Sequence, residues 1–180
     1  MALLVSSKEK KNNLHLFCRI GYSLLSSTSL PFSLRYDLLR ADLSLVVDQA
    51  LDRETISSYQ FQILAQDGGN RTGLLNVHIT IDDVNDCPPK FDQTIYTVKN
   101  ISENLPIGSL VFRVHATDAD QGVNGDITYQ LINAKNCFEI DPILGDIRVL
   151  CALDYETKMN YRLEIEARDG GEGSKTDFCT

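Results

Sequence analysis

Apolar and polar residues alternate along most of the chain from residue 43 onward. This period of two is typical of β-strands, and the helical period is scarce. The clearest alternating segments are residues 59–65, 75–81, 110–116, 127–131 and 161–167. Residues 138–140 and 147–149 flank the sequence DPILGD, which is typical of a hairpin turn. Several short strands separated by turn signals predict an all-β fold of the antiparallel sandwich type.

The chain also contains an internal repeat. Residues 51–69 and 153–171 align without a gap at an offset of 102 positions (153 − 51), and they share a leading Leu-Asp, a Glu-Thr pair and a closing Asp-Gly-Gly. A period near 100 residues is the size of one small domain and is too long for a solenoid repeat of roughly 20–50 residues. The chain is therefore predicted to hold two tandem domains of one type.

The boundary between the two domains is predicted at residues 83–89, whose sequence DVNDCPP ends a strand and carries two prolines that cannot continue a β-ladder. Residues 1–40 have no assignment. Residues 41–86 are expected to be the C-terminal part of the first repeat, and residues 87–180 a second repeat without a counterpart of the strand at 74–81. Both repeats would then be incomplete, as in a fragment of a longer repeat protein.

The net charge and the distribution of apolar residues argue against some classes of function. The 180 residues include 17 basic and 25 acidic side chains, for a net charge of −8. This balance argues against a nucleic-acid-binding surface, which needs clustered Lys and Arg. Neither a signal peptide nor a membrane span is evident, since His15, Arg19 and several serines interrupt the most apolar stretch, residues 14–34.

The acidic residues form short groups at the ends of the predicted strands. The groups are Asp52/Glu54, Asp83/Asn85/Asp86, Glu103/Asn104, Asp118/Asp120 and Asp154/Glu156, with single residues at Asp67 and Asp169. In extended backbone, residues two apart point the same way, so each group offers two oxygens to one point. Gathered carboxylates repel one another unless a cation neutralises them. Calcium, which takes about six to eight oxygens in irregular cages, suits them better than magnesium.

Three other interpretations of the acidic groups compete with a calcium site. An EF-hand starting at Asp118 fails, because Val123 stands where the loop needs glycine and Tyr129 where it needs glutamate. A two-carboxylate hydrolase has little support from three histidines and no tryptophan, so the chain is not expected to be an enzyme or to take a small-molecule substrate. The third interpretation is that the acids are solvated turn residues. It explains any single Asp-Gly turn, but it explains less well why the same acids recur in both copies. The five cysteines show no CxxC spacing of a structural zinc site.

Several motifs in this order resemble the extracellular repeats of the cadherin superfamily, most closely those of the protocadherin, Fat and Dachsous type. Leu51-Asp52-Arg53-Glu54 is similar to the LDRE motif, and Leu153-Asp154-Tyr155-Glu156 is a variant of it. Residues 83–91 are similar to the interrepeat linker DxNDNxPxF. The remaining matches are Ser102-Glu103-Asn104 (xEN), Asp118-Ala119-Asp120 with Asn124-Gly125 (DAD…NG), and the AxD motifs ending at Asp67 and Asp169.

The resemblance implies tandem Greek-key β-sandwiches with three calcium ions in each junction. It assigns to the two ions nearer the first repeat Asp52, Glu54, Asp83, Asp86 and the Val84 carbonyl. It assigns to the third ion Asn85, the Cys87 carbonyl, Asp118, Asp120, the Asn124 carbonyl and Asp169, with Asp120 also bridging. Glu103, Asp154 and Glu156 would form half of the next junction.

The implied function is that of a calcium-binding module in a cell-adhesion or recognition receptor, with calcium stiffening the junction. Its partners would be other cadherin-type ectodomains, bound homophilically or heterophilically. Its location would be the extracellular part of a plasma-membrane protein. The alternative is a non-adhesive extracellular spacer with structural calcium or none, and a hydrolase is a remote third.

Two departures from the family pattern bear on this function. Cys87 stands where the family usually has Asn, which would leave a thiol beside the metal site. The first repeat also has no xEN glutamate before Asp52, so the first two ions should bind weakly or not at all. With no tryptophan in the chain, adhesion by exchange of an N-terminal Trp strand has no support.

Covalent modifications can also be proposed from the sequence. Asn70 and Asn100 begin N-glycosylation triplets, which would be used in a secreted protein. Cys137 and Cys151 flank the predicted hairpin and fall almost opposite each other. A disulfide there would stabilise the fold by ~3 kcal/mol in the chain-entropy model. Two free core thiols are the alternative.

Overall fold

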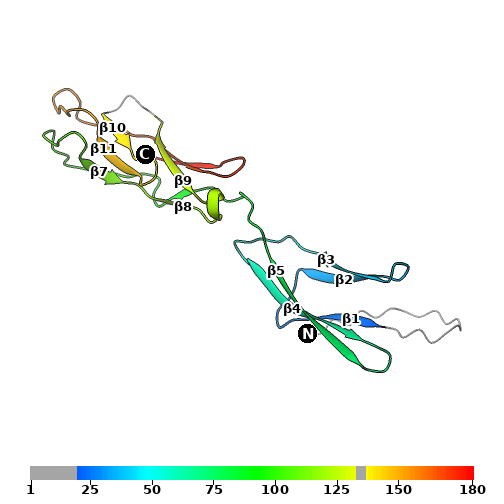
Figure 1. Cartoon of the computed structure of the whole chain (residues 1–180). Coiled ribbons are helices and arrows are strands. Elements are labelled where there is room, and N and C mark those ends of the chain that lie inside the picture. Colours follow the sequence, from blue (N-terminus) through cyan, green and yellow to red (C-terminus); the bar gives the residue numbers. More distant parts are fainter. Residues whose placement is uncertain (1–19, 133–136) are drawn as a thin grey trace. The chain divides into compact units, whose positions relative to one another are not determined.

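The computed structural model describes residues 20–132 and 137–180, and it divides the chain into a first unit, residues 1–82, and a second unit, residues 83–180. Its strands, in chain order, are β1 (Gly21–Leu25), β2 (Phe32–Asp37), β3 (Asp42–Val47), β4 (Ser58–Gln66), β5 (Thr72–Thr80), β6 (Lys90–Phe91), β7 (Leu110–Arg113), β8 (Ala116–Thr117), β9 (Ile127–Leu131), β10 (Phe138–Ile140), β11 (Asp146–Val149), β12 (Ile165–Asp169) and β13 (Thr176–Cys179) (Figure 1). The single helical element in these residues is a 3₁₀ turn, η1 (Gly122–Asn124). No helix in the described part of the chain has the length and hydrophobicity to cross a bilayer.

The first unit is built around a long antiparallel pair. Strand β4 pairs with β5 over nine residues on one side and with β1 on the other, and β2 and β3 form a separate hairpin. Among the described residues of this unit, Pro31, Phe32 and Phe61 are buried, and the ring centroids of the two phenylalanines lie 5.8 Å apart. Tyr59 packs edge-on against Phe32, with a centroid distance of 5.1 Å. Aromatic contacts of this kind stabilise a fold beyond the area that they bury.

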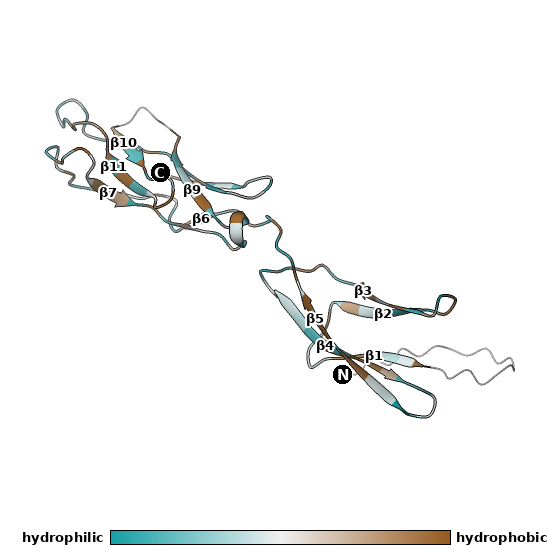
Figure 2. Ribbon diagram, in the orientation of Figure 1, coloured by the Kyte–Doolittle hydropathy of each residue, from teal (hydrophilic) through white to brown (hydrophobic). Residues whose placement is uncertain are grey.

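The second unit has two three-stranded antiparallel sheets, in the orders β10-β11-β7 and β13-β12-β9, and a short pair, β6-β8. Apolar residues, brown in Figure 2, lie along β11, and they face inward from alternate positions. One core joins both sheets, since Val149 of β11 and Ala167 of β12 are both fully buried within it. Such packing of two sheets through their apolar faces is a β-sandwich.

A disulfide joins Cys137 and Cys151 at the open end of the β10–β11 hairpin, with their Cα atoms 4.8 Å apart. At the turn end of the same hairpin Asp146 is buried, and its carboxylate is paired with Arg113 and with Arg148. A buried carboxylate is tolerated where cationic partners satisfy both of its oxygens.

The structure differs from the sequence-based expectations in three places. Strands β1 and β2 lie within residues 1–40, to which the sequence pattern assigns no element. Residues 1–19 of that segment lie outside the described residues. The second repeat was expected to lack a counterpart of the strand at 74–81, yet β13 pairs with β12 as β5 does with β4. This strand was missed because its four residues are too few for a period of two to show. Strand β12 begins at Ile165 rather than near 161, because its partners β9 and β13 extend only to the positions opposite Ile165.

Two phenylalanines of the second unit test how far its stability depends on this core. Phe91 is 5% exposed and contacts the Tyr129 ring, whereas Phe178 is 51% exposed. We expect Phe91→Ala to lower the free energy of unfolding by about 3–5 kcal/mol, because it removes a ring and leaves a cavity. Phe178→Ala should change it by no more than ~0.5 kcal/mol. Urea denaturation monitored by circular dichroism measures both, and equal losses would contradict the assigned core.

Candidate metal centre

The segment that opens the second unit is tied to the loop around η1 by side-chain hydrogen bonds. Asp83 Oδ2 accepts hydrogen bonds from Gln121 N at 3.0 Å and from Asn124 Nδ2 at 2.8 Å. Farther along, Cys87 N donates to Asp120 Oδ2 at 3.1 Å. These bonds hold residues 83–87 against the DAD…NG segment, so two stretches about 35 residues apart in sequence form one site.

Three carboxylates of this site are shielded from water. Asp120 is 7% exposed and Asp169 is 2% exposed, while Asp118 is half-buried. Burial raises the pKa of Asp118 above its ordinary value, and the neighbouring charges of Asp120 and Asp169 act in the same direction. The site therefore disfavours its own negative charge when no cation is bound.

Several buried oxygens of the site have no hydrogen-bond partner among the residues that the structure describes. They are Asn85 Oδ1, Asp118 Oδ2 and Asp120 Oδ1. A buried acceptor without a partner carries a desolvation cost of about 1–3 kcal/mol, and more when it is charged. Three such oxygens from a linker and a neighbouring loop are the donor type that calcium takes. The residues present thus fit a calcium ion.

The backbone around these oxygens is tightly packed at two glycines. A Cβ on Gly125 would overlap the Asp120 carbonyl oxygen, and a Cβ on Gly171 would overlap the side chains of Asn85 and Asn124. Asp169 Oδ1 accepts hydrogen bonds from Asn85 Nδ2 and from Gly171 N, both at 3.1 Å. Gly171, the second glycine after the AxD motif, therefore lets the side-chain amide of Asn85 approach Asp169, which gives a role to a residue that the sequence alone marks only as part of a turn.

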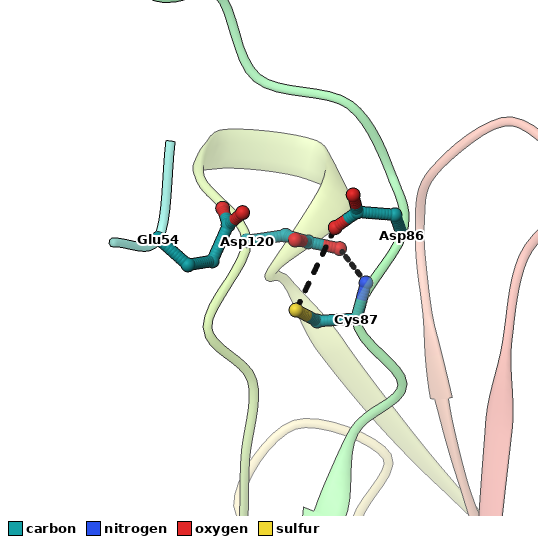
Figure 3. Close-up of side chains that lie close together, drawn as sticks. All are labelled: Glu54, Asp86, Cys87 and Asp120. Atoms are coloured by element: carbon teal, nitrogen blue, oxygen red, sulfur yellow. Dashed lines mark hydrogen bonds between the residues drawn. The ribbon is translucent and has the colours of Figure 1, made fainter. Parts of the chain in front are cut away.

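Cys87 places its thiol beside two of the acidic side chains (Figure 3). Its Sγ lies 3.6 Å from Asp86 Oδ1, and ligand atoms of Asp86, Cys87 and Asp120 all lie within 4.8 Å of one another. Burial, together with the charge of Asp120, raises the pKa of the Cys87 thiol to about 11. Glu54, drawn in the same view, belongs to the first unit.

A second acidic group of the second unit contains Glu103, Asp154 and Glu156, whose ligand atoms also lie within 4.8 Å of one another. All three are exposed. Glu103 Oε2 accepts a hydrogen bond from Tyr155 N at 3.0 Å. The structure thus brings together the residues that the resemblance assigned to half of another junction.

The first unit positions its acids by the same local bonds as the second. Asp52 accepts hydrogen bonds from Thr55 N at 3.0 Å and Thr55 Oγ1 at 2.9 Å, and Asp154 accepts the equivalent bonds from Thr157 at 3.1 and 2.7 Å. Glu54 forms an ion pair with Arg53. Sequence reasoning gave Thr55 and Thr157 no role, although their recurrence after Leu-Asp-x-Glu in both copies was a signal for it.

The remaining candidates have simpler surroundings. Val84 is exposed, and its carbonyl accepts a hydrogen bond from Asp86 N at 2.7 Å. Asn70 and Asn100 are exposed and have positive φ angles of 64° and 61°, as in turns. His78 and His115, the histidines in the described residues, belong to neither acidic group, and His115 Nδ1 lies 3.1 Å from Asp92 Oδ2.

The bonds from Thr157 predict how acid acts on the metal-free protein. The Thr157 hydroxyl and backbone N–H hold the pKa of Asp154 below its ordinary value of 3.8. Because this pKa is lowered in the fold, the stability that Asp154 contributes is present above pH ~3.8 and is lost as the pH falls through the folded-state pKa. Thr157→Val should raise this pKa toward 3.8, and ¹³C NMR titration of the carboxyl carbon measures it. An unchanged midpoint in the variant would show that the hydroxyl bond does not set the pKa.

Comparisons with known proteins agree with this architecture. The Cadherin domain family model matches residues 97–180. Protocadherin-19 of Danio rerio is 42% identical over 142 residues, which are 75% of this chain and 13% of that protein. Protocadherin alpha-2 of Homo sapiens is 38% identical over 168 residues, which are 89% of this chain and 18% of that protein. The chain thus spans less than a fifth of the length of these relatives.

Solved structures give the same result. The protocadherin gammaB7 EC3-6 cis-dimer structure superposes with a TM-score of 0.81 at 28% identity, over 89% of this chain and 39% of that chain. Mouse cadherin-23 EC22-24 superposes with a TM-score of 0.75 at 31% identity, over 89% of this chain and 51% of that chain. The predicted all-β repeat fold is therefore confirmed, and the relatives are protocadherins rather than enzymes, as expected. The chain belongs to the cadherin superfamily.

Proposed function

We propose that the chain is part of the extracellular region of a plasma-membrane adhesion or recognition receptor, and that its second unit binds calcium through the linker and the DAD…NG loop. The observation that carries the calcium assignment is the group of buried oxygens without hydrogen-bond partners among the described residues, at Asn85, Asp118 and Asp120. The proposed ligands are Asn85, Asp118, Asp120, Asp169 and the carbonyls of Cys87 and Asn124.

The chemistry of this donor set favours calcium over other common cations. All of the proposed ligands supply oxygen, and two of them are backbone carbonyls, which calcium accepts readily. The ligands come from separated loops, and calcium tolerates the irregular cage that such loops make better than magnesium does. Bound calcium would neutralise the carboxylates of Asp118, Asp120 and Asp169.

The side chains of the site give this binding a mechanical role. Without a cation the carboxylates repel one another, and the linker is held by hydrogen bonds to carboxylate oxygens, such as Asn124 Nδ2 to Asp83 Oδ2. With the repulsion removed, residues 83–87 would be fixed to the second unit by both sets of contacts. A stiffer linker would restrict the motion of one repeat relative to the next.

Other acids would serve further ions in such a receptor. We propose Asp52, Glu54, Asp83, Asp86 and the Val84 carbonyl as ligands of ions nearer the first repeat. Glu103, Asp154 and Glu156 would supply half of the next junction. Partners of the receptor would be other cadherin-type ectodomains, since a relative of this fold is described as a cis-dimer.

The variant Asp120→Asn tests the calcium site with little change in side-chain shape. We expect it to weaken calcium binding about tenfold or more, because it removes a buried charged ligand. The same change should raise the melting temperature of the calcium-free protein, because it removes repulsion between buried carboxylates. Melting curves from micromolar to millimolar calcium, with magnesium for comparison, measure both effects, since ligand binding to the folded state raises its stability.

Asp92→Asn is the matched control, because Asp92 is an exposed aspartate of the same unit that contacts only His115 among the bonds described above. It should leave the calcium-induced shift as in the native sequence. An equal calcium response in Asp120→Asn and the native chain would refute the site.

A further inference from the structure

We propose that Cys87 Sγ and the carboxylates of Asp86 and Asp120 form a binding site for a thiophilic divalent cation of the Zn²⁺ class. Ligand atoms of these three residues lie within 4.8 Å of one another, and Cys87 Sγ lies 3.6 Å from Asp86 Oδ1. Zinc is bound at about 2.3 Å by thiolate sulfur and about 2.0–2.2 Å by carboxylate oxygen, which places ligands of one ion about 3–4 Å apart. Small side-chain rotations would bring these three atoms to that spacing.

The second observation is the state of Asp120. This residue is 7% exposed, its Oδ2 accepts the hydrogen bond from Cys87 N at 3.1 Å, and its Oδ1 has no hydrogen-bond partner in residues 20–132 and 137–180. A buried carboxylate oxygen without a donor favours a cation beside it. The bond from Cys87 N also fixes the residue that carries the thiol next to this carboxylate.

The thiol decides which class of cation the site can take. Calcium and magnesium bind oxygen ligands, whereas zinc and cadmium bind thiolates strongly. On coordination the Cys87 S–H releases its proton to solvent, and the sulfur binds the metal as thiolate. Among the described cysteines, Cys87 is the one whose thiol can bind such a cation, since Cys137 and Cys151 form a disulfide and Cys179 is buried in the core.

The same geometry couples this cation to calcium. Asp86 and Asp120 are ligands in the calcium proposal above, so a zinc ion on Cys87 would withdraw two carboxylates from the calcium set. Zinc would then antagonise calcium at the linker. This competition rests on the proposed calcium function, but zinc binding itself does not.

The first test uses cadmium as a spectroscopic substitute for zinc on the untagged full chain, without calcium. Cadmium should add an ultraviolet thiolate-to-metal charge-transfer band that saturates at one ion per chain. Cys87→Ser should abolish the band, and Cys18→Ser, the control for the cysteine outside the described residues, should keep it. A band that persists in Cys87→Ser, or no band in the native chain, would overturn the proposal.

The second test does not depend on a cysteine variant. Zinc should slow the alkylation of Cys87 by iodoacetamide at least tenfold, as mapped by mass spectrometry, whereas magnesium should not. Asp120→Asn keeps the thiol and should weaken this protection by about tenfold. Protection that is absent in the native chain, or unaltered by Asp120→Asn, would refute the three-ligand site.

Calcium added to the cadmium complex separates this proposal from the calcium function. Loss of the charge-transfer band at millimolar calcium supports both. A band that calcium never displaces supports the thiophilic site and refutes the sharing of Asp86 and Asp120 with calcium. Calcium binding by a chain that shows no cadmium band refutes the thiophilic site alone.

Discussion

The repulsion among shielded carboxylates at the start of the second unit is the constraint on which the arrangement of this region depends. Asp118 and Asp120, in the loop after β8, and Asp169, at the end of β12, are all shielded from water, and burial raises the pKa of Asp118. Among the residues that the structure describes, these three carboxylates form no salt bridge, in contrast to Asp146, whose buried carboxylate is paired with Arg113 and Arg148. Asp146 is thus neutralised by protein groups, whereas for the other three carboxylates we propose that a cation has this role.

The acids that recur in both repeats therefore have two roles. Asp52 and Asp154 organise their own turns through Thr55 and Thr157, and Asp67 does so through the N–H groups of Gly69 and Arg71, each at 2.8 Å. Both partners of each bond are protein groups, so these bonds do not require a metal. An acid that recurs in both copies therefore indicates that both copies contain the same turn. It indicates a metal site only where one of its carboxylate oxygens has no hydrogen-bond donor.

In the proposed calcium site Cys87 would contribute only its backbone carbonyl, so the identity of its side chain would matter little to that site. When a residue contributes only its backbone carbonyl, its side chain is free to vary, and here the variation places a thiol between two carboxylates. Its backbone N–H still donates to Asp120, so the local fold is maintained. Cys87 thereby supplies a sulfur atom, whereas the other proposed metal ligands supply oxygen.

Much of the fold follows from the sequence because β-strands with one buried face carry a period of two, which marks β4, β5, β9 and the β10–β11 hairpin without any long-range information. The repeat at an offset of 102 residues and the motif order were enough to identify the family. The bounds of short or late-starting strands were not, because β1, β2, β13 and the start of β12 are set by which neighbour is available to pair, and pairing is a tertiary property.

The sequence by itself determined which residues could bind a cation, because carboxylate, amide and thiol groups are properties of the residues. Only the tertiary structure decided which of them meet. It placed Asp83 as an acceptor for Gln121 and Asn124, brought Asn85 to Asp169 across Gly171, and left Asp118 and Asp120 each with a buried oxygen that no described donor reaches. Burial and hydrogen-bond partners depend on segments distant in sequence, so no local pattern contains them.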